Sequence, residues 1–159
     1  MKRKGLIVMD KKPSFERSYN TNLAAEYYVL SILYRKGVEA YLTIGNKKSV
    51  DIIVKSKDGK IVTIDVKGLV EPTSWPIENV KPKPDHYIAF VSFNKKIRDE
   101  NSLPEVFIVP SVDIIDERLK LVYTNPKGSR RVVQYVRLKR YKDKYLNNWA
   151  VFYQQEIGS

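Results

Sequence analysis

The sequence contains no cysteine and only one histidine, His86. The lack of cysteine excludes disulfide scaffolds, thiolate zinc sites and cysteine nucleophiles. A single histidine also excludes metal sites built from several histidines and mechanisms that need two. A metal in this protein would therefore be bound by oxygen atoms, which points to Mg²⁺ or Mn²⁺.

Long hydrophobic runs are also missing. The apolar run Leu6 to Met9 is too short for the core of a signal peptide, although it could form a short edge strand. No stretch is long and apolar enough to span a bilayer. We therefore expect a cytoplasmic protein without membrane contact. Its 159 residues, of which 43% are hydrophobic, match a single domain over residues 1–159.

Acidic residues are scarce relative to basic ones. The chain has 29 Lys and Arg residues against 18 Asp and Glu residues, a net charge of +11. An excess of this size predicts attraction to a polyanion, either a nucleic acid or an acidic membrane face.

The pattern of apolar and turn-forming residues predicts an α/β fold, with a central mixed sheet flanked by helices. A helix over 21–36 is favoured by its 3-4-3 apolar spacing, a cap at Asn20 or Thr21, and Gly37 after its end. Because Glu26 is the only charged residue from Ser18 to Tyr34, we expect this helix to be largely buried. The other predicted elements are strands over 39–44, 50–54, 61–66, 87–93, 106–109 and 131–138, a proline-rich loop over 71–84, a short helix over 111–120 capped by Ser111, and a C-terminal segment docked through Trp149, Val151 and Phe152.

Two of these strands carry acids, and the turn between them decides whether the acids meet. Asp65 and Lys67 share one face of the third strand, because side chains alternate along a strand. A two-residue loop at Asp58-Gly59 would place Asp51 opposite Val66, on the other face. A three-residue loop with Gly59 in the left-handed region would pair Ser56 with Lys60, and Asp51 would then lie opposite Asp65.

Under the second register, two carboxylates and one ammonium converge. Two adjacent acids repel each other unless a cation neutralises them. Asp51 and Asp65 would then hold Mg²⁺ or Mn²⁺, with the carbonyl of Val66 as a further ligand. Lys67 would orient or deprotonate the attacking water or stabilise charge on the phosphate, and Glu26 could reach the metal or its water from the preceding helix. No organic cofactor is expected.

This arrangement resembles the PD-(D/E)xK nuclease superfamily. The resemblance rests on Glu26, Val50-Asp51 and Ile64-Asp65-Val66-Lys67-Gly68, and it covers about residues 20–112. Val50 replaces the proline of the motif, and Asp65 replaces the more usual glutamate. The nearest branch looks like the Holliday-junction resolvase and Mrr-like group, together with uncharacterised bacterial relatives. The resemblance implies a restriction-endonuclease-like fold, and it implies a homodimer because relatives commonly pair.

Less specific interpretations exist for each of these residues. Glu26 could lie on a helix surface, and Asp65 with Lys67 could belong to an ordinary exposed sheet face. Asp51 is harder to explain in this way, because it interrupts an apolar strand. His86 is better explained as structural than as catalytic, since no partner for it is indicated nearby.

A basic C-terminal extension over 125–159 follows the motif region. Over 125–144 it has eight Lys or Arg residues against one acid, Asp143. This composition fits either a solvent-exposed face or a surface that binds a phosphate backbone. Trp75 could be an exposed stacking residue, or it could pin its proline-rich loop. The residues predicted to contact nucleic acid are Lys47, Lys48, Trp75, Arg130, Arg131, Lys139 and Arg140.

The sequence therefore predicts a metal-dependent endonuclease that cleaves phosphodiester bonds in duplex or branched DNA. Two alternatives remain. One is a nucleic-acid-binding module with the same fold but without catalysis. The other is a protein-interaction domain whose positive charge serves solubility or a protein partner.

Overall fold

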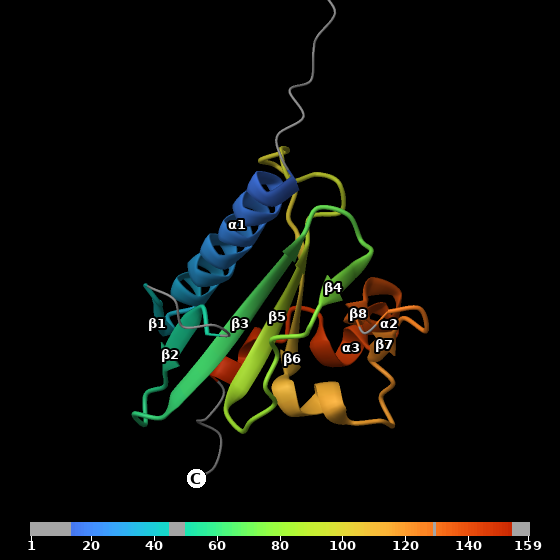
Figure 1. Cartoon of the computed structure of the whole chain (residues 1–159). Coiled ribbons are helices and arrows are strands. Elements are labelled where there is room, and N and C mark those ends of the chain that lie inside the picture. Colours follow the sequence, from blue (N-terminus) through green and yellow to red (C-terminus); the bar gives the residue numbers. More distant parts are fainter. Residues whose placement is uncertain (1–13, 45–49, 129, 154–159) are drawn as a thin grey trace, which may run out of the picture.

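The computed structural model describes residues 14–44, 50–128 and 130–153 (Figure 1). The predicted edge strand at Leu6–Met9 lies outside these residues. The helical elements are α1 (Ser14–Arg35), α2 (Tyr135–Lys139), α3 (Lys142–Tyr145) and two 3₁₀ helices, η1 (Ser111–Ile115) and η2 (Trp149–Phe152). The strands are β1 (Glu39–Leu42), β2 (Ile52–Lys55), β3 (Ile61–Leu69), β4 (Ser74–Pro76), β5 (His86–Ser92), β6 (Glu105–Pro110), β7 (Val122–Thr124) and β8 (Arg131–Gln134).

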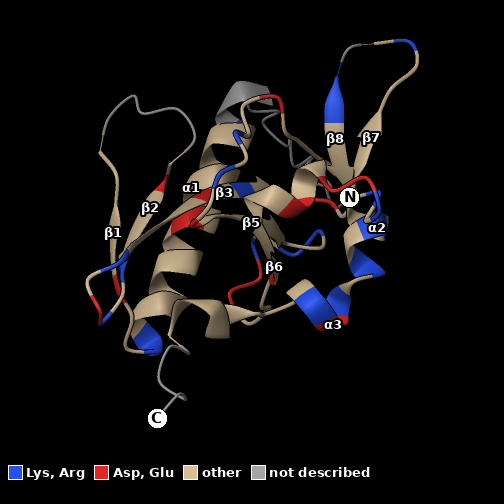
Figure 2. Ribbon diagram, turned by 90° about the horizontal axis from the view of Figure 1, so that it is seen from below, with Lys and Arg blue, Asp and Glu red and all other residues tan. Residues whose placement is uncertain are grey.

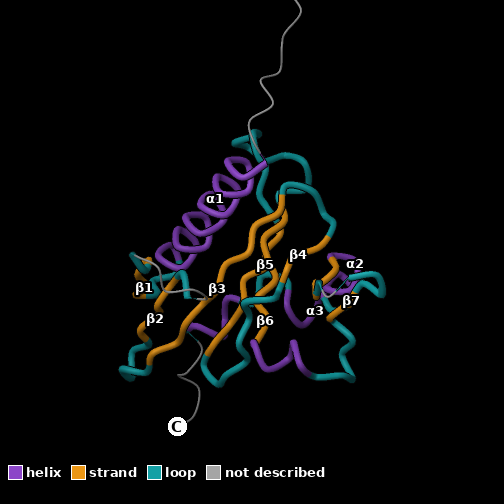
Figure 3. Tube along the Cα trace, viewed as in Figure 1, coloured by secondary structure: helices purple, strands orange, loops and turns teal. Residues whose placement is uncertain are grey.

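A mixed five-stranded sheet forms the centre of the fold, and it confirms the predicted α/β class. Its strand order is β1-β2-β3-β5-β6. Strands β3 and β5 run parallel, and all other neighbours in this sheet are antiparallel. Helix α1 lies along one face of the sheet (Figures 1 and 3). Its buried Ala25, Val29 and Leu33 pack there against alternate residues of β2, β3 and β5.

Helix α1 ends where the sequence predicts but begins earlier. Gly37 has a φ of +74°, its N–H donates to the carbonyl of Tyr34, and the N–H of Val38 donates to the carbonyl of Leu33. This pair of bonds is the Schellman motif, in which a left-handed residue closes the helix. The predicted cap at Asn20 or Thr21 is wrong, because the helix already begins at Ser14. The hydroxyl of Thr21 instead donates to the carbonyl of Arg17, 2.7 Å away within the helix.

Only one face of α1 is buried, so the expectation of a largely buried helix is wrong. Tyr19, Tyr27 and Tyr34 have exposed fractions of 57%, 60% and 54%. Their rings are uncharged but amphipathic, and the hydroxyl of Tyr34 donates to the carbonyl of Ala40 at 2.6 Å. The scarcity of charge between Ser18 and Tyr34 was therefore a poor indicator of burial, because tyrosine tolerates the surface.

A second, smaller sheet covers the other face of the central sheet, in the strand order β4-β8-β7. Trp75 of β4 is fully buried, and its ring packs against Phe90 and Phe107 of the central sheet. Residues 121–146 supply much of this second core through Leu121, Val133, Leu138 and Tyr145. Residues 133–146 of the predicted basic C-terminal region therefore belong to the packed fold.

Several local predictions need correction in this region. The predicted strand over 131–138 divides into β8 and α2, and the predicted helix over 111–120 is the single 3₁₀ turn η1. Ser111 does not cap η1; its hydroxyl instead donates to the carbonyl of Lys83 and accepts from the N–H of Lys83. Trp149 and Phe152 dock in the first core as predicted, with Val151 packed against it. Among the described residues, no helix is both long enough and apolar enough to cross a membrane.

Candidate active site

The β2–β3 hairpin adopts the three-residue loop that brings the acids together. Gly59 has a φ of +84°, and the N–H of Ser56 donates to the carbonyl of Lys60. The paired residues run from Lys55 opposite Ile61 to Ile52 opposite Ile64. The regular pairing ends at Ile52, and Asp51 leaves it, because its N–H donates to the carbonyl of Ile64, the partner of Ile52. Asp51 nevertheless lies close enough to Asp65 for the charge of Asp65 to raise its pKa, so this register brings the two acids together. The alternative two-residue loop is wrong.

Asp51 caps the end of the β2–β3 ladder. Its N–H donates to the carbonyl of Ile64 at 2.9 Å, and its Oδ2 accepts a 2.7 Å hydrogen bond from the N–H of Val66. The carboxylate thus replaces the strand carbonyl that would otherwise satisfy this N–H. The carbonyl of Val66 faces the same edge, because the N–H and C=O groups of one strand residue point the same way.

The same edge of β3 approaches helix α1 closely. The N–H of Gly68 donates to the Oδ1 of Asn22 at 3.1 Å. A Cβ atom at Gly68 would lie only 2.8 Å from the carbonyl oxygen of Thr21, so glycine allows this approach. Asn22 was not predicted to belong to the site. Its spacing of four residues from Glu26, which places both on one helix face, is the signal that could have indicated it.

Asp65 and Lys67 form an ion pair on the face of β3 that points away from α1. Asp65 is buried, with an exposed fraction of 4%, and the Nζ of Lys67 lies 3.1 Å from its Oδ2. This contact lacks the angles of a hydrogen bond, so Oδ2 has no hydrogen-bond donor among the described residues. A buried carboxylate oxygen with electrostatic compensation only is unusual, and it is typical of sites that accept a further ligand.

The pKa values show that the three acids influence one another. Burial raises the pKa of Asp51 to about 7, the N–H of Val66 works against this shift, and the charges of Asp65 and Glu26 add to it. Burial also raises the pKa of Glu26, and the charge of Asp65 raises it further. Glu26 is therefore close enough to Asp65 for the charge of Asp65 to raise its pKa.

The donor atoms available here suit a hard divalent cation only in part. Two carboxylates and the carbonyl of Val66 are oxygen donors of the kind that Mg²⁺ and Mn²⁺ prefer. However, within the described ranges no three His, Cys, Asp or Glu side chains gather closely enough to form a ready metal site. Glu26 thus does not join Asp51 and Asp65 in a preformed three-acid cluster. The candidate oxygen ligands for a cation are therefore the two hairpin acids and the carbonyl of Val66, without Glu26.

His86 lies beside this site, which the sequence did not indicate. It pairs with Thr63 across the β3–β5 ladder, and its Nδ1 lies 2.8 Å from the Thr63 hydroxyl. Burial and the charge of Lys83 lower the pKa of His86, and the charge of Asp65 opposes this shift. Being buried and hydrogen-bonded within the sheet, His86 has the structural surroundings that the sequence suggested.

The residues predicted to contact nucleic acid fall into three groups. Lys47 and Lys48 lie outside the described residues. The expectation of a surface role for Trp75 is wrong, because the ring is buried and its Nε1 donates to the carbonyl of Val91 at 3.3 Å. The remaining four lie around β8 and α2, where basic residues are prominent (Figure 2).

These four cations differ in how far they are neutralised. Lys139 donates to both carboxylate oxygens of Glu105, at 2.9 and 2.8 Å, and Arg130 lies 3.6 Å from Glu78. Arg131 and Arg140 are exposed and form no ion pair with any described residue. Arg131 and Arg140 are thus the two that remain available to an external anion.

Comparisons of the chain with models of protein families, with curated proteins and with solved structures found no match.

Proposed function

We propose that this protein is a metal-dependent endonuclease that hydrolyses phosphodiester bonds in DNA. The observation that carries the proposal is the grouping of three charged side chains at the end of the β2–β3 hairpin. Asp51 accepts from the N–H of Val66 and lies close to Asp65, and the Lys67 ammonium lies 3.1 Å from the Asp65 carboxylate. We also propose that these residues form a PD-(D/E)xK motif, which they resemble. A restriction-endonuclease-like fold is part of the same proposal. The mixed sheet with α1 on one face is consistent with it.

Each residue of the site has a distinct part in this chemistry. Asp51, Asp65 and the carbonyl of Val66 would hold Mg²⁺ or Mn²⁺. When bound, the ion would polarise the scissile phosphate and lower the pKa of a water molecule. Lys67, with an exposed side-chain fraction of 18%, reaches the surface beside Asp65 and can orient the attacking water or stabilise negative charge on the phosphate. Glu26, whose pKa is raised, can exchange a proton with that water.

The hairpin itself supplies matched controls for an activity test. Supercoiled plasmid and branched DNA would be incubated with Mg²⁺ or Mn²⁺, and nicking would be followed by gel electrophoresis. We expect Asp65→Asn and Lys67→Ala to lower the rate by about 100-fold or more. Asp58→Asn and Lys60→Ala change exposed residues on the same hairpin and should leave the rate within about twofold. Nicking that survives Asp65→Asn would remove the acid site from the mechanism.

A DNA-binding module without catalysis is the second candidate, and one feature favours it. No acidic residue occurs between Glu117 and Asp143, while Lys and Arg recur throughout this segment. Such a segment binds a phosphate backbone whether or not the acids catalyse cleavage. Retention of DNA without nicking in either metal would support this candidate. If DNA is not retained at any salt concentration, a protein-interaction domain is the better explanation.

The proposal also includes a homodimer, because cleavage of both strands of a duplex or junction needs two sites. Sedimentation equilibrium over a range of protein concentrations, with and without branched DNA, measures this directly. A protein that stays monomeric on branched DNA would be limited to nicking one strand.

A further inference from the structure

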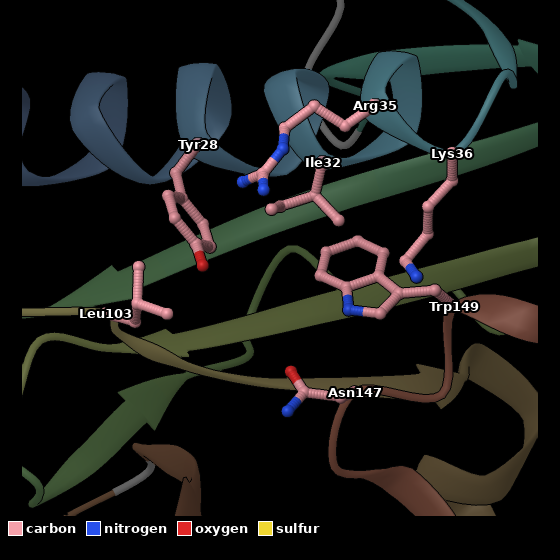
Figure 4. Close-up of a pocket in the computed structure, with 7 residues that line it drawn as sticks. All are labelled: Tyr28, Ile32, Arg35, Lys36, Leu103, Asn147 and Trp149. Carbon is pink, nitrogen blue, oxygen red and sulfur yellow. The ribbon is translucent and has the colours of Figure 1, made fainter.

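A cavity of about 450 Å³ lies between the C-terminal half of α1 and two later segments of the chain (Figure 4). Its size falls in the range of small-molecule sites. It is separate from the acid site, because Tyr28 follows Glu26 by two residues and so points about 200° further around the helix. The lining residues are Tyr28, Ile32, Arg35, Lys36, Leu103, Asn147 and Trp149.

The cavity is cationic and has no acid in its lining. Arg35 and Lys36 form no ion pair within the part of the chain that the structure describes. The guanidinium of Arg35 extends toward Tyr28, and the ammonium of Lys36 extends toward the indole of Trp149 (Figure 4). Cations without a counter-charge favour an anion. The two heads point toward opposite ends of the cavity (Figure 4), and the Lys36 ammonium lies 5.7 Å from the centroid of the Tyr153 ring, so a phosphate bound by both would draw these exposed side chains together.

Two aromatic rings line the same cavity beside these cations. Trp149 has an exposed fraction of only 5%, so the first core holds its ring in place. Tyr28 is partly buried, and burial raises its pKa while the charge of Arg35 opposes the shift. Tyr28 can stack on a planar heterocycle, whereas Trp149 is almost fully buried and offers a ligand only a small part of its ring. Asn147 contributes an amide that can both donate and accept, at a residue held in the left-handed region with a φ of +52°.

We propose that this cavity binds a nucleotide, with its phosphate on Arg35 and Lys36 and its base stacked on Tyr28, next to the small exposed part of Trp149. The ligand could be a free mononucleotide or the phosphorylated end of a nucleic-acid strand, since both present the same chemistry. The inference is independent of the proposed nuclease activity, because none of the lining residues belongs to the acid site.

The two tryptophans of the chain make the test specific. Trp75 is buried in the second core, so a Trp75→Phe variant reports only on Trp149. This protein would be titrated with dAMP, deoxyadenosine, inorganic phosphate and a 5′-phosphorylated trinucleotide, with fluorescence and calorimetry as readouts. We expect dAMP to bind with quenching of Trp149, and to bind more tightly than either deoxyadenosine or phosphate. If the trinucleotide binds more tightly than dAMP, the cavity serves strand ends; if it binds more weakly, the cavity serves free nucleotides.

Charge variants separate this cavity from general attraction to a basic protein. The double variant Arg35→Gln with Lys36→Gln should weaken dAMP binding by about tenfold or more. The matched variant Lys120→Gln with Lys127→Gln removes the same charge from exposed positions elsewhere and should not change it. Tyr28→Leu should weaken dAMP while leaving phosphate unaffected. Equal losses in both double variants, absence of quenching, or phosphate binding as tightly as dAMP would each overturn the proposal. Asp65→Asn should retain dAMP binding even if it abolishes nicking.

Discussion

The carboxylate of Asp51 accepts a 2.7 Å hydrogen bond from the backbone N–H of Val66 and so forms the last rung between β2 and β3. A side chain thus takes the place of a strand carbonyl at the point where β2 ends. The bond holds one acid of the candidate site next to the Val66 carbonyl and beside Asp65. It also gives Asp51 a structural part as well as a chemical one.

The raised pKa of Asp51 predicts that stability without added metal falls as the pH rises. Its folded-state pKa of about 7 lies above the ordinary value of 3.8, so the folded protein holds this proton more tightly than the unfolded chain. The resulting stabilisation is complete below about pH 4 and is lost as the pH passes through about 7. Because Asp51 is partly exposed, we expect a loss on the order of 2 kcal/mol.

Urea unfolding at several pH values from 4 to 8 would measure this dependence. Asp51→Asn keeps a hydrogen-bond acceptor for Val66 but cannot titrate, so most of the pH dependence should disappear. A smaller residual dependence from Glu26, whose pKa is also raised, should remain. If wild-type protein and Asp51→Asn show the same slope, Asp51 is not the group that titrates.

Gly59 sets the hairpin register. Replacing it should lower the free energy of unfolding through backbone strain and not through a steric clash. Its φ is +84° and a Cβ atom there would meet nothing within 4 Å. Gly59→Ala should therefore destabilise the protein by about 1–2 kcal/mol, and Gly59→Asn should cost less because asparagine tolerates this region. Thermal unfolding of both variants tests the order; a larger loss for asparagine would contradict the turn geometry.

At Gly68, in contrast to Gly59, there is little room for a side chain. A Cβ atom would lie 2.8 Å from the Thr21 carbonyl oxygen and 3.0 Å from the Ala25 Cβ. Gly68→Ala should therefore push α1 away from β3 and cost about 1–3 kcal/mol. Gly128→Ala is the matched control, since a Cβ there meets nothing within 4 Å. Similar stabilities for the two variants would show that the helix yields without cost.

Trp75 should matter for folding and not for DNA contact. Its ring is fully buried against Phe90 and Phe107, so Trp75→Ala should cost about 3–5 kcal/mol. Trp75→Phe retains most of the apolar packing and should lose less. The DNA affinity of the folded Trp75→Phe protein should equal that of the wild type. A specific loss of affinity in this variant, at unchanged stability, would restore the surface role.

The exposed arginines around β8 and α2 should account for the salt dependence of DNA binding. Arg131→Gln and Arg140→Gln should each lower the slope of log affinity against log salt by about 0.9 if each contacts one phosphate. Lys139→Gln should change this slope less, because Lys139 is paired with Glu105. Fluorescence anisotropy at several salt concentrations measures the slopes. A larger change for Lys139→Gln would show that this ion pair opens on DNA.

Local sequence chemistry predicted the features that depend on a few neighbouring residues. Gly37 ends α1, and Gly59 selects the three-residue loop that brings Asp51 close to Asp65. Both follow from the φ values that glycine tolerates and from the two-residue period of a strand. The α/β class followed from the same alternation of helical and strand patterns. To predict the helix end and the hairpin loop, interactions between residues no more than about 15 positions apart in the sequence were sufficient.

Tertiary packing decided what local patterns left open. Trp75 could be exposed or buried by its sequence context, and it is buried by contacts with distant residues such as Phe90, Phe107 and Tyr135. The same holds for the cavity that Arg35 and Trp149 both line, and for the second core, to which residues 121–146 contribute. These contacts join residues far apart along the chain. Their formation depends on the shape and apolar area that distant segments present to each other, which no local pattern encodes.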